Sequence, residues 1–304
     1  MEPGIPEVKI DALLPPEMAA KAEDVGVRKA QLALPDMFAL AVLAGAFIAM
    51  GAVFATTVTA GGITLKGPDG AVALTTALPY GVSRLLAGVA FSLGLILVVV
   101  GGAELFTGNN LIVMAWTSRK VSTAALLRSW AIVYAGNFVG ASASAGLLFA
   151  SKQYQFSAGA VGLNALRTAS AKVGYEFSQA VVLGILGNAL VCMAVWLCYS
   201  ARSTGDKILA IVLPISAFVA AGFEHSIANM YFIPLGVLIR DYAPPEFWKQ
   251  VGETPEKFAN LTWGNYFAGN LLPVTVGNLI GGVVMVGGLY WFVYLRGKAR
   301  GTAR

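Results

Sequence analysis

The sequence contains few charged residues. Asp, Glu, Lys and Arg make up 12% of its 304 residues, whereas they make up roughly a quarter of an ordinary soluble domain. Hydrophobic residues make up 57%, and the mean hydropathy is +0.71. This composition excludes a soluble globular protein and indicates an integral membrane protein. Because one transmembrane helix uses about 20 residues, the chain suits one compact bundle, and we expect a single domain embedded in the lipid bilayer.

Histidine and cysteine are also scarce, and this limits the chemistry available to the chain. The only histidine is His225, and the two cysteines are Cys192 and Cys198. A single histidine cannot supply both axial ligands of a bis-histidine haem, and no Gly-x-Ser-x-Gly turn is present. We therefore predict no catalytic residue, no cofactor and no metal site, and the protein is not expected to be an enzyme. Helical spacing turns the two cysteines to different faces, which predicts buried thiols rather than a disulfide.

Six apolar segments follow a charged N-terminal stretch. They lie at residues 36–60, 82–114, 126–150, 177–200, 208–239 and 263–295. An even number of spans places both termini on one side, and basic residues dominate the C-terminus and the connections after the second and fourth segments. The positive-inside rule then makes both termini cytoplasmic. We expect a cytoplasmic N-terminal segment at 1–34, a transmembrane domain at 35–296 and a cytoplasmic tail at 297–304.

The N-terminal segment contains one predicted helix, which Pro15 and Pro16 open. Met18, Ala22 and Val25 share one face of it. This face either lies against the membrane surface or a neighbouring subunit, or belongs to a solvated helix, and both alternatives stay open. The formal net charge of +5 includes no basic run long enough to predict a nucleic-acid partner.

Two of the apolar segments contain polar interruptions at matching places. Residues 101–110 interrupt the second segment around Glu104, and residues 221–230 interrupt the fifth around Glu224 and His225. The third and sixth segments share a Gly-Asn-x-x-Gly motif at 136–140 and 277–281. The pattern predicts an all-α membrane protein of six transmembrane helices, built as an inverted three-plus-three repeat with helices 2 and 5 broken. In such repeats a solute path runs between the two halves near the membrane midplane.

The interruptions also indicate the kind of solute. Irregular backbone at membrane depth is tolerated only where it is buried in protein or lines a water-filled cavity. The N-termini of half-helices favour anions, and His225 can add a positive charge or a transferable proton. We therefore expect a small anion. Apolar side chains around the break are predicted to constrict its path: Phe91, Leu95, Leu105 and Phe218.

The polar residues have structural explanations as well. Glu104 and Glu224 are interpreted as acceptors for loose backbone N–H groups rather than as transport groups. A buried histidine is often a hydrogen-bonded core residue, but the matched breaks favour a functional role for His225. Three asparagines either line the path or make interhelical hydrogen bonds, and both alternatives stay open: Asn137, Asn188 and Asn278.

Residues 99–108 and 222–230 resemble the two signature loops of the formate/nitrite transporter family, and the likeness extends from about residue 13 to residue 295. Arg240 and Asp241, followed by residues 245–248, are most similar to the formate channels of that family. The resemblance implies a homopentamer of aquaporin-like protomers in the bacterial inner membrane, with one pore in each protomer. It implies formate and similar small monovalent anions as substrates.

The resemblance also implies roles for individual residues. His225 would be the central protonatable group and would face Thr107. The gate on the cytoplasmic side would consist of Leu95, Leu105, Phe106 and Thr107, and the outer constriction of Phe91 and Phe218. Asn188 and Asn278 would be polar pore residues, and Lys172 would be a basic residue of the outer funnel. Structural support for the two loops would come from Glu104, Glu224 and Asn229.

The fourth segment departs from the family pattern. Residues 187–194 carry smaller side chains than usual, which either widen the pore or alter helix packing, and Gly108-Asn109-Asn110 also occurs outside the formate branch. A nitrite or hydrosulfide channel on the same fold is therefore an alternative. A channel for neutral solutes such as water or glycerol is an alternative of another class.

Overall fold

A computed structural model describes residues 11–66, 68 and 72–299 of the chain. Five helices in this part are long and apolar enough to cross a membrane. They are α2 (Leu34–Val58), α3 (Tyr80–Gly101), α6 (Thr123–Ala150), α8 (Phe177–Ser200) and a continuous helical stretch, Asn265–Tyr294. The last comprises η4 (Asn265–Leu271), α12 (Leu272–Leu279), η5 (Ile280–Gly288) and α13 (Leu289–Tyr294), of which η4 and η5 are π-helical. The helical class of the prediction agrees with this architecture.

The fifth predicted segment consists of two helices instead of one. They are α9 (Thr204–Ala220) and α10 (Ser226–Tyr242), of 17 residues each, and residues 221–225 separate them. The second predicted segment is interrupted too, since residues 102–105 separate α3 from α4 (Phe106–Asn109), η1 (Asn110–Ile112) and α5 (Val113–Thr117). Each interruption lies where the sequence places a polar stretch in an apolar run.

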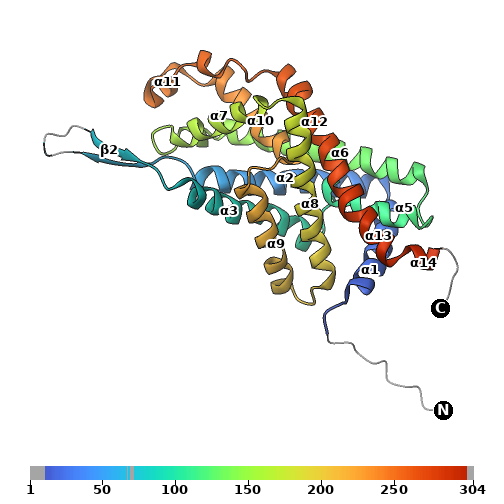
Figure 1. Cartoon of the computed structure of the whole chain (residues 1–304). Coiled ribbons are helices and arrows are strands. Elements are labelled where there is room, and N and C mark those ends of the chain that lie inside the picture. The colour runs from blue at the N-terminus through green and yellow to red at the C-terminus, as the bar shows by residue number, and fades with distance from the viewer. Residues whose placement is uncertain (1–10, 67, 69–71, 300–304) are drawn as a thin grey trace, which may run out of the picture.

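Several shorter elements lie outside the apolar segments. A two-stranded antiparallel hairpin, β1 (Ile63–Lys66) and β2 (Val72–Thr76), joins α2 to α3, and the sequence did not predict it. The hairpin projects from one end of the molecule, whereas α1 (Pro15–Ala30) and α14 (Arg296–Ala299) lie at the other (Figure 1). We call these the hairpin end and the terminal end. The remaining elements are η2 (Gln153–Gln155), α7 (Ala160–Val173), α11 (Pro245–Val251) and η3 (Pro255–Phe258).

The helix α1 packs against the terminal end of the bundle, where η1, α5 and α8 contact it. Its apolar face is buried, including Met18 and Ala22. This face packs against the helices of its own chain, which neither of the two alternatives for this segment anticipated.

Glycines allow the long helices to approach each other closely, and they do so in two matching pairs. A Cβ atom at Gly140 of α6 would lie 2.0 Å from the Val42 carbonyl oxygen of α2. A Cβ at Gly281 of η5 would lie 2.1 Å from the Ile185 carbonyl oxygen of α8. No side chain fits at either position, so the pair α2–α6 and the pair α8–η5 are packed in the same way.

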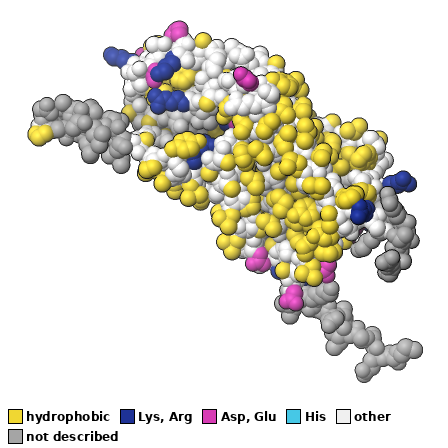
Figure 2. All heavy atoms as spheres, viewed as in Figure 1, with side chains coloured by type: hydrophobic (Ala, Val, Ile, Leu, Met, Phe, Trp, Pro, Cys, Tyr) yellow, Lys and Arg dark blue, Asp and Glu magenta, His cyan; other side chains and the backbone are white. Residues whose placement is uncertain are grey.

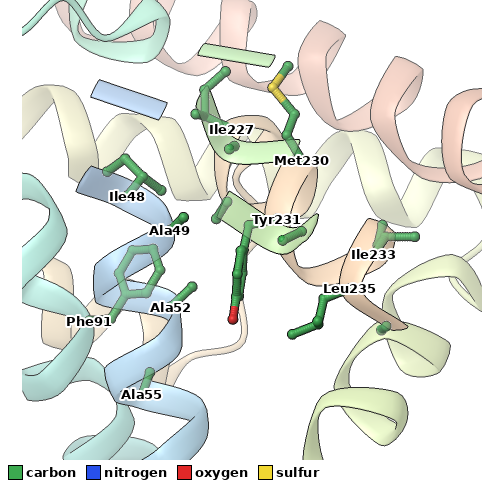
Figure 3. Close-up of a cluster of buried hydrophobic side chains, with 14 of the residues drawn as sticks. Ile48, Ala49, Ala52, Ala55, Phe91, Ile227, Met230, Tyr231, Ile233 and Leu235 are labelled. Carbon is green, nitrogen blue, oxygen red and sulfur yellow. The ribbon is translucent and has the colours of Figure 1, made fainter. Parts of the chain in front are cut away.

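The surface of the bundle is strongly apolar. Figure 2 shows hydrophobic side chains covering its middle, with charged side chains towards the two ends. Leu209 and Leu213 on α9, for example, expose 72% and 76% of their surface. Inside, the small residues Ala49 and Ala52 of α2 allow α10 to pack close, with the buried ring of Tyr231 beside them (Figure 3). An exposed apolar surface of this extent fits a lipid or a subunit environment rather than water.

Candidate functional site

The two helix breaks have the same backbone design. After α3, Gly102 adopts a left-handed conformation with φ of 77°, and after α9, Gly222 does so with φ of 75°. Glycine accepts this conformation without the steric cost that a Cβ atom brings. In both cases the N–H group of the residue after the glycine donates a hydrogen bond to a carbonyl oxygen in the last turns of the preceding helix. Ala103 N donates to Val98 O (2.9 Å), and Phe223 N donates to Phe218 O (3.2 Å).

A buried asparagine holds the first break in place. The Asn137 Nδ2 group donates to Ala41 O (2.7 Å) and to Glu104 O (2.9 Å), and its Oδ1 accepts from Phe106 N (2.9 Å). The bonds to Glu104 O and Phe106 N satisfy two backbone groups that the interrupted helix leaves unpaired, which would otherwise be costly to bury, and the bond to Ala41 O joins the break to α2.

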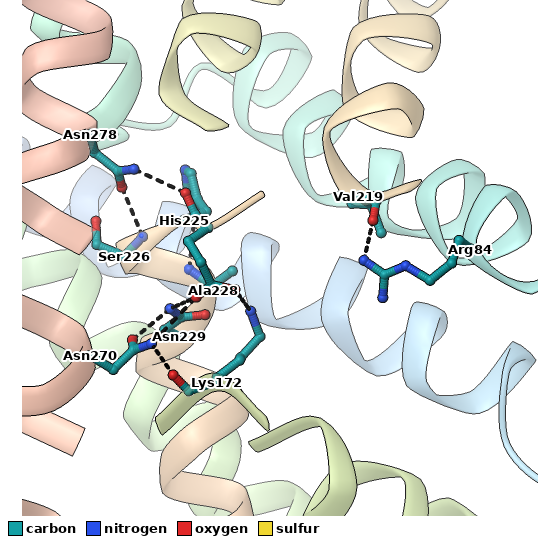
Figure 4. A network of polar contacts seen from close by, with 10 residues as sticks. Arg84, Lys172, Val219, His225, Ser226, Ala228, Asn229, Asn270 and Asn278 are labelled. Carbon is teal, nitrogen blue, oxygen red and sulfur yellow. Dashed lines mark hydrogen bonds and ion pairs between the residues drawn. The ribbon is translucent and has the colours of Figure 1, made fainter. Parts of the chain in front are cut away.

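Asn278 supports the second break with the same three bonds. Its Nδ2 group donates to Gly184 O (2.8 Å) and to Glu224 O (3.0 Å), and its Oδ1 accepts from Ser226 N (2.9 Å; Figure 4). Asn137 and Asn278 are the asparagines of the two Gly-Asn-x-x-Gly motifs. Since their donors and acceptors are all used within the protein, the structure favours the interhelical alternative for both.

Glu104 is held by a cation from the N-terminal helix. The residue is 5% exposed, Lys29 Nζ lies 2.8 Å from Oε1, and Asn109 Nδ2 donates to Oε2 (2.7 Å). Sequence reasoning missed Lys29. The internal repeat contains a signal for this lysine. The N–H group of Glu104 donates to Leu40 O, and the N–H group of Glu224 donates to Leu183 O, so the two leucines are equivalent. Lys29 precedes Leu40 by as many residues as Lys172 precedes Leu183.

Glu224 has the equivalent partners at the other break. It is 1% exposed, Lys172 Nζ from α7 lies 2.7 Å from Oε1, and Asn229 Nδ2 donates to Oε2 (2.6 Å). Asn270 Nδ2 adds a longer bond to Oε2 (3.4 Å). Both carboxylates are therefore paired acceptors inside the two breaks, but the groups that donate to them are lysine and asparagine side chains rather than the loose backbone N–H groups that the sequence interpretation gave them.

The two breaks meet at Thr107 and His225. The Nε2 atom of His225 lies 2.9 Å from Thr107 Oγ1, and both side chains are buried. His225 is also the N-cap of α10, since its Nδ1 atom accepts from Ala228 N (3.1 Å). An Nδ1 atom that accepts carries no proton, so the proton of the neutral ring is on Nε2. In this tautomer Nε2–H donates to Thr107, and the Thr107 hydroxyl proton is left to point elsewhere.

A cavity of about 80 Å³ opens next to His225 on the side of the hairpin end. Its lining includes His225, the aromatic rings of Phe91 and Phe218, and the cations Arg84 and Lys172. The two rings lie 6.0 Å apart between centroids. A second cavity, of about 270 Å³, shares Arg84 and Lys172 with the first. A cationic vestibule thus leads to an apolar narrowing beside the histidine.

A larger cavity of about 450 Å³ lies at the terminal end. Leu95 and Leu105, each 2% exposed, belong to its lining. Four cations line it as well: Lys21, Arg28, Lys29 and Lys207. Burial lowers the pKa of the Lys21 amine, and the nearby Lys207, Arg202 and Arg28 lower it further, which indicates a surplus of positive charge. This cavity shares no lining residue with the one beside His225.

Four residues with predicted pore roles are absent from the linings of these cavities: Phe106, Thr107, Asn188 and Asn278. The Asn188 Nδ2 group donates to Asn278 O (2.7 Å) and Asn110 Oδ1 (2.7 Å). The Phe106 ring packs edge-on against Tyr134, with centroids 4.9 Å apart. The two cysteines are buried free thiols, as predicted.

Taken together, these features define a class: a helical membrane protein with a cationic cavity at each end and a polar junction of two helix breaks between them. This is the construction of a channel or transporter. Within the described residues, no cluster of three or more His, Cys, Asp or Glu side chains is placed to hold a metal ion.

The chain belongs to the formate/nitrite transporter family, whose profile matches residues 16–292. It is 49% identical over 286 residues to the formate channel FocA of Escherichia coli (strain K12), covering 94% of this chain and 96% of that protein. It is 40% identical to the formate channel FocA of Haemophilus influenzae, with 91% and 93% covered. The predicted resemblance is therefore confirmed.

Solved structures are similar as well. One described as a pentameric formate channel with formate bound has a TM-score of 0.76 at 41% identity, and the match covers 86% of this chain and 98% of that chain. These relatives are named as channels, not enzymes, which agrees with the prediction that the chain is not an enzyme.

Proposed function

We propose that the protein is a transmembrane channel for formate and similar small monovalent anions, and that the anion passes between the two cavities at the Thr107–His225 pair. The single observation that carries the proposal is this pair: two breaks from different parts of the chain meet at 2.9 Å, between cavities whose walls are cationic. The names of the relatives, formate channels at 49% and 40% identity, support formate as the anion.

The proposed architecture is the inverted three-plus-three repeat of six spans, in an aquaporin-like protomer. The equivalent bonds of Asn137 and Asn278 support it, as do the equivalent ion pairs of Glu104 and Glu224. We place the terminal end in the cytoplasm of a bacterium and the hairpin end outside its inner membrane, because basic residues predominate near the termini. A homopentamer with one pore in each protomer is supported by the pentameric structure that the chain resembles.

In this mechanism apolar rings and leucines exclude the hydrated ion, since burying an unpaired charge is costly. Phe91 and Phe218 form the outer constriction, and Leu95 and Leu105 the inner one. Between them the Thr107 hydroxyl donates a hydrogen bond to the anion and is itself polarised by His225 Nε2–H. Loss of a proton from neutral His225 would leave an imidazolate. The ring can therefore give a proton to the anion only after Nδ1 has gained a second proton and has lost the bond from Ala228 N. This geometry favours electrostatic assistance of the anion by His225 over protonation of the anion.

Flux of labelled formate into proteoliposomes tests the proposal. His225→Phe removes the Nε2–H group that polarises the Thr107 hydroxyl and so weakens the hydrogen bond from Thr107 to the anion. Because a hydrogen bond to a charged group contributes roughly 1.5–3 kcal/mol, flux is expected to fall by about tenfold. His225→Asn is the matched variant, because asparagine is a good N-cap and retains the cap of α10 while losing the reach to Thr107. It should fold like the wild type and still lose flux. Unchanged flux and pH dependence in both variants would remove His225 from the mechanism.

The alternatives are separated in the same vesicles. Competition of formate flux by nitrite and by hydrosulfide ranks the anions, and stopped-flow swelling measures water and glycerol. Swelling faster than in protein-free vesicles, without formate flux, would favour the neutral-solute channel.

A further inference from the structure

Arg84 lies in the first turns of α3, directly after the hairpin. Its Nη2 group donates to the carbonyl oxygen of Val219 on α9, as Figure 4 shows. The same nitrogen lies beside the left-handed Gly222, where an added Cβ atom would be 3.6 Å away. Arg84 thus joins α3 to the end of α9, and the cavity beside His225 includes both Arg84 and Val219 in its lining.

The end of α9 is unfavourable for an anion. Helix C-termini carry partial negative charge on carbonyl oxygens that have no partner in the helix. Val219 O, in the last turn of α9, accepts turn bonds from the N–H groups of Ala221 and Gly222 (3.1 Å for Gly222) besides the bond from Arg84. An anion approaching His225 from the hairpin end passes this carbonyl. The positive charge of the Arg84 guanidinium outweighs the partial negative charge of the carbonyl oxygen, so the anion meets a net positive charge there.

The other charged groups of this vestibule are already paired. Lys172 pairs with Glu224, and Arg167 lies 3.3 Å from Glu253. In the described part of the chain, no carboxylate forms an ion pair with Arg84. Its Nε atom is moreover buried without a hydrogen-bond partner. A buried donor without a partner is unfavourable, and a ligand with an acceptor oxygen would satisfy it.

We propose that Arg84 is the group that recognises the anion in the outer cavity and selects anions with two oxygen atoms, such as carboxylates, over single-centre anions. This inference rests on the proposed function. One N–H bond of the guanidinium, on Nη2, is used by Val219 O. The remaining N–H groups, Nε–H among them, form the pair of parallel donors that matches the two oxygen atoms of a carboxylate. The cavity of about 80 Å³ is large enough for a small anion, since one water needs roughly 10–15 Å³ on the same measure.

The test compares Arg84→Gln and Arg84→Lys with the wild type in formate flux at a series of concentrations. Arg84→Gln keeps a donor for Val219 O but removes the charge, and it should raise the half-saturating formate concentration about tenfold. Arg84→Lys keeps the charge and removes the fork. It should bring the half-saturating concentrations of formate and hydrosulfide closer together by a similar factor. Arg167→Gln removes a cation that Glu253 already pairs and serves as the matched control, with a change below about twofold.

A binding measurement separates this inference from the proposed function. We expect formate to raise the melting temperature of the purified wild type and to raise that of Arg84→Gln less at the same concentration. A wild type that formate stabilises but that conducts no formate would overturn the proposed function and leave the site in place. Arg84→Gln with a lower melting temperature but wild-type half-saturation and wild-type formate stabilisation would overturn the inference, because Arg84 would then only cap α9. An equal effect of Arg167→Gln would overturn it too.

Discussion

At the scale of single residues, the proposed mechanism depends on the hydrogen bonds of the two ring nitrogens of His225. The Nδ1 atom of His225 accepts from the backbone of α10, and the Nε2 atom faces the Thr107 hydroxyl. The first bond determines the tautomer, and the tautomer determines that Nε2 is a donor. The threonine hydroxyl is therefore the group that can present a polarised O–H to an anion.

Thr107 itself is expected to be as sensitive as the histidine. Thr107→Val keeps the shape and removes the hydroxyl, which leaves His225 Nε2–H buried without an acceptor. We expect roughly tenfold lower formate flux, because the hydrogen bond to the anion is lost. Thr107→Ser keeps the hydroxyl and should retain most of the flux. The measurement is initial flux per protein in proteoliposomes, and a Val variant as active as the Ser variant would exclude the hydroxyl from the path.

At the scale of elements, the site depends on two helix breaks that would be unstable without their asparagines. Each interruption leaves backbone N–H and C=O groups inside the bundle, and one asparagine side chain satisfies two of them while its third bond goes to a carbonyl oxygen of a neighbouring helix. The ion pairs of Lys29 with Glu104 and of Lys172 with Glu224 then connect each break to a helix outside it, α1 in one case and α7 in the other.

Removal of either asparagine should therefore destabilise the fold. Asn278→Ala leaves buried backbone groups without partners, and we expect the free energy of unfolding to fall by about 2–4 kcal/mol. Asn137→Ala should have a similar effect because it makes the same bonds. Asn265→Ala is the control, since Asn265 is exposed and its side chain makes one bond, from Nδ2 to Asn260 O (2.8 Å). Thermal unfolding in detergent measures all three, and equal melting temperatures would contradict the supporting role.

At the scale of the whole molecule, the apolar surface has to be covered. Large side chains on α9 and on the other long helices are exposed around the bundle, and lipid and neighbouring protomers are the two environments that suit them. Membership of the family and the pentameric structure that the chain resembles support five protomers around one axis, each with its own pair of cavities.

Native mass spectrometry of the detergent-solubilised protein is expected to give five times the protomer mass of 31.7 kDa. If each protomer conducts by itself, mixed assemblies of wild type and His225→Phe should show flux proportional to the wild-type fraction. A steeper dependence, or a mass of a single protomer at every concentration, would contradict independent pores within a pentamer.

Much of this was predictable from local pattern. The apolar segments, the two polar interruptions, and the importance of Glu104, Glu224 and His225 follow from the scarcity of polar residues at membrane depth, where each such residue is conspicuous. The hairpin, α7 and the packed position of α1 were not predicted, because short elements outside the membrane carry no comparable hydrophobic signal. Lys29 and Arg84 were missed for a related reason. Cations near the ends of spans are common, and the role of each one becomes clear only when its bonding partner in the folded structure is known.

By itself, the sequence determined that the chain is a membrane protein with two interrupted helices, because hydropathy and glycine placement act over neighbouring residues. The family resemblance already placed His225 opposite Thr107, but the tertiary structure alone decided that Asn278 binds the backbone on both sides of a break, that Lys29 pairs with Glu104, and that Arg84 faces the end of α9. These contacts join residues from distant parts of the chain, and only packing of the helices brings their side chains within hydrogen-bonding distance.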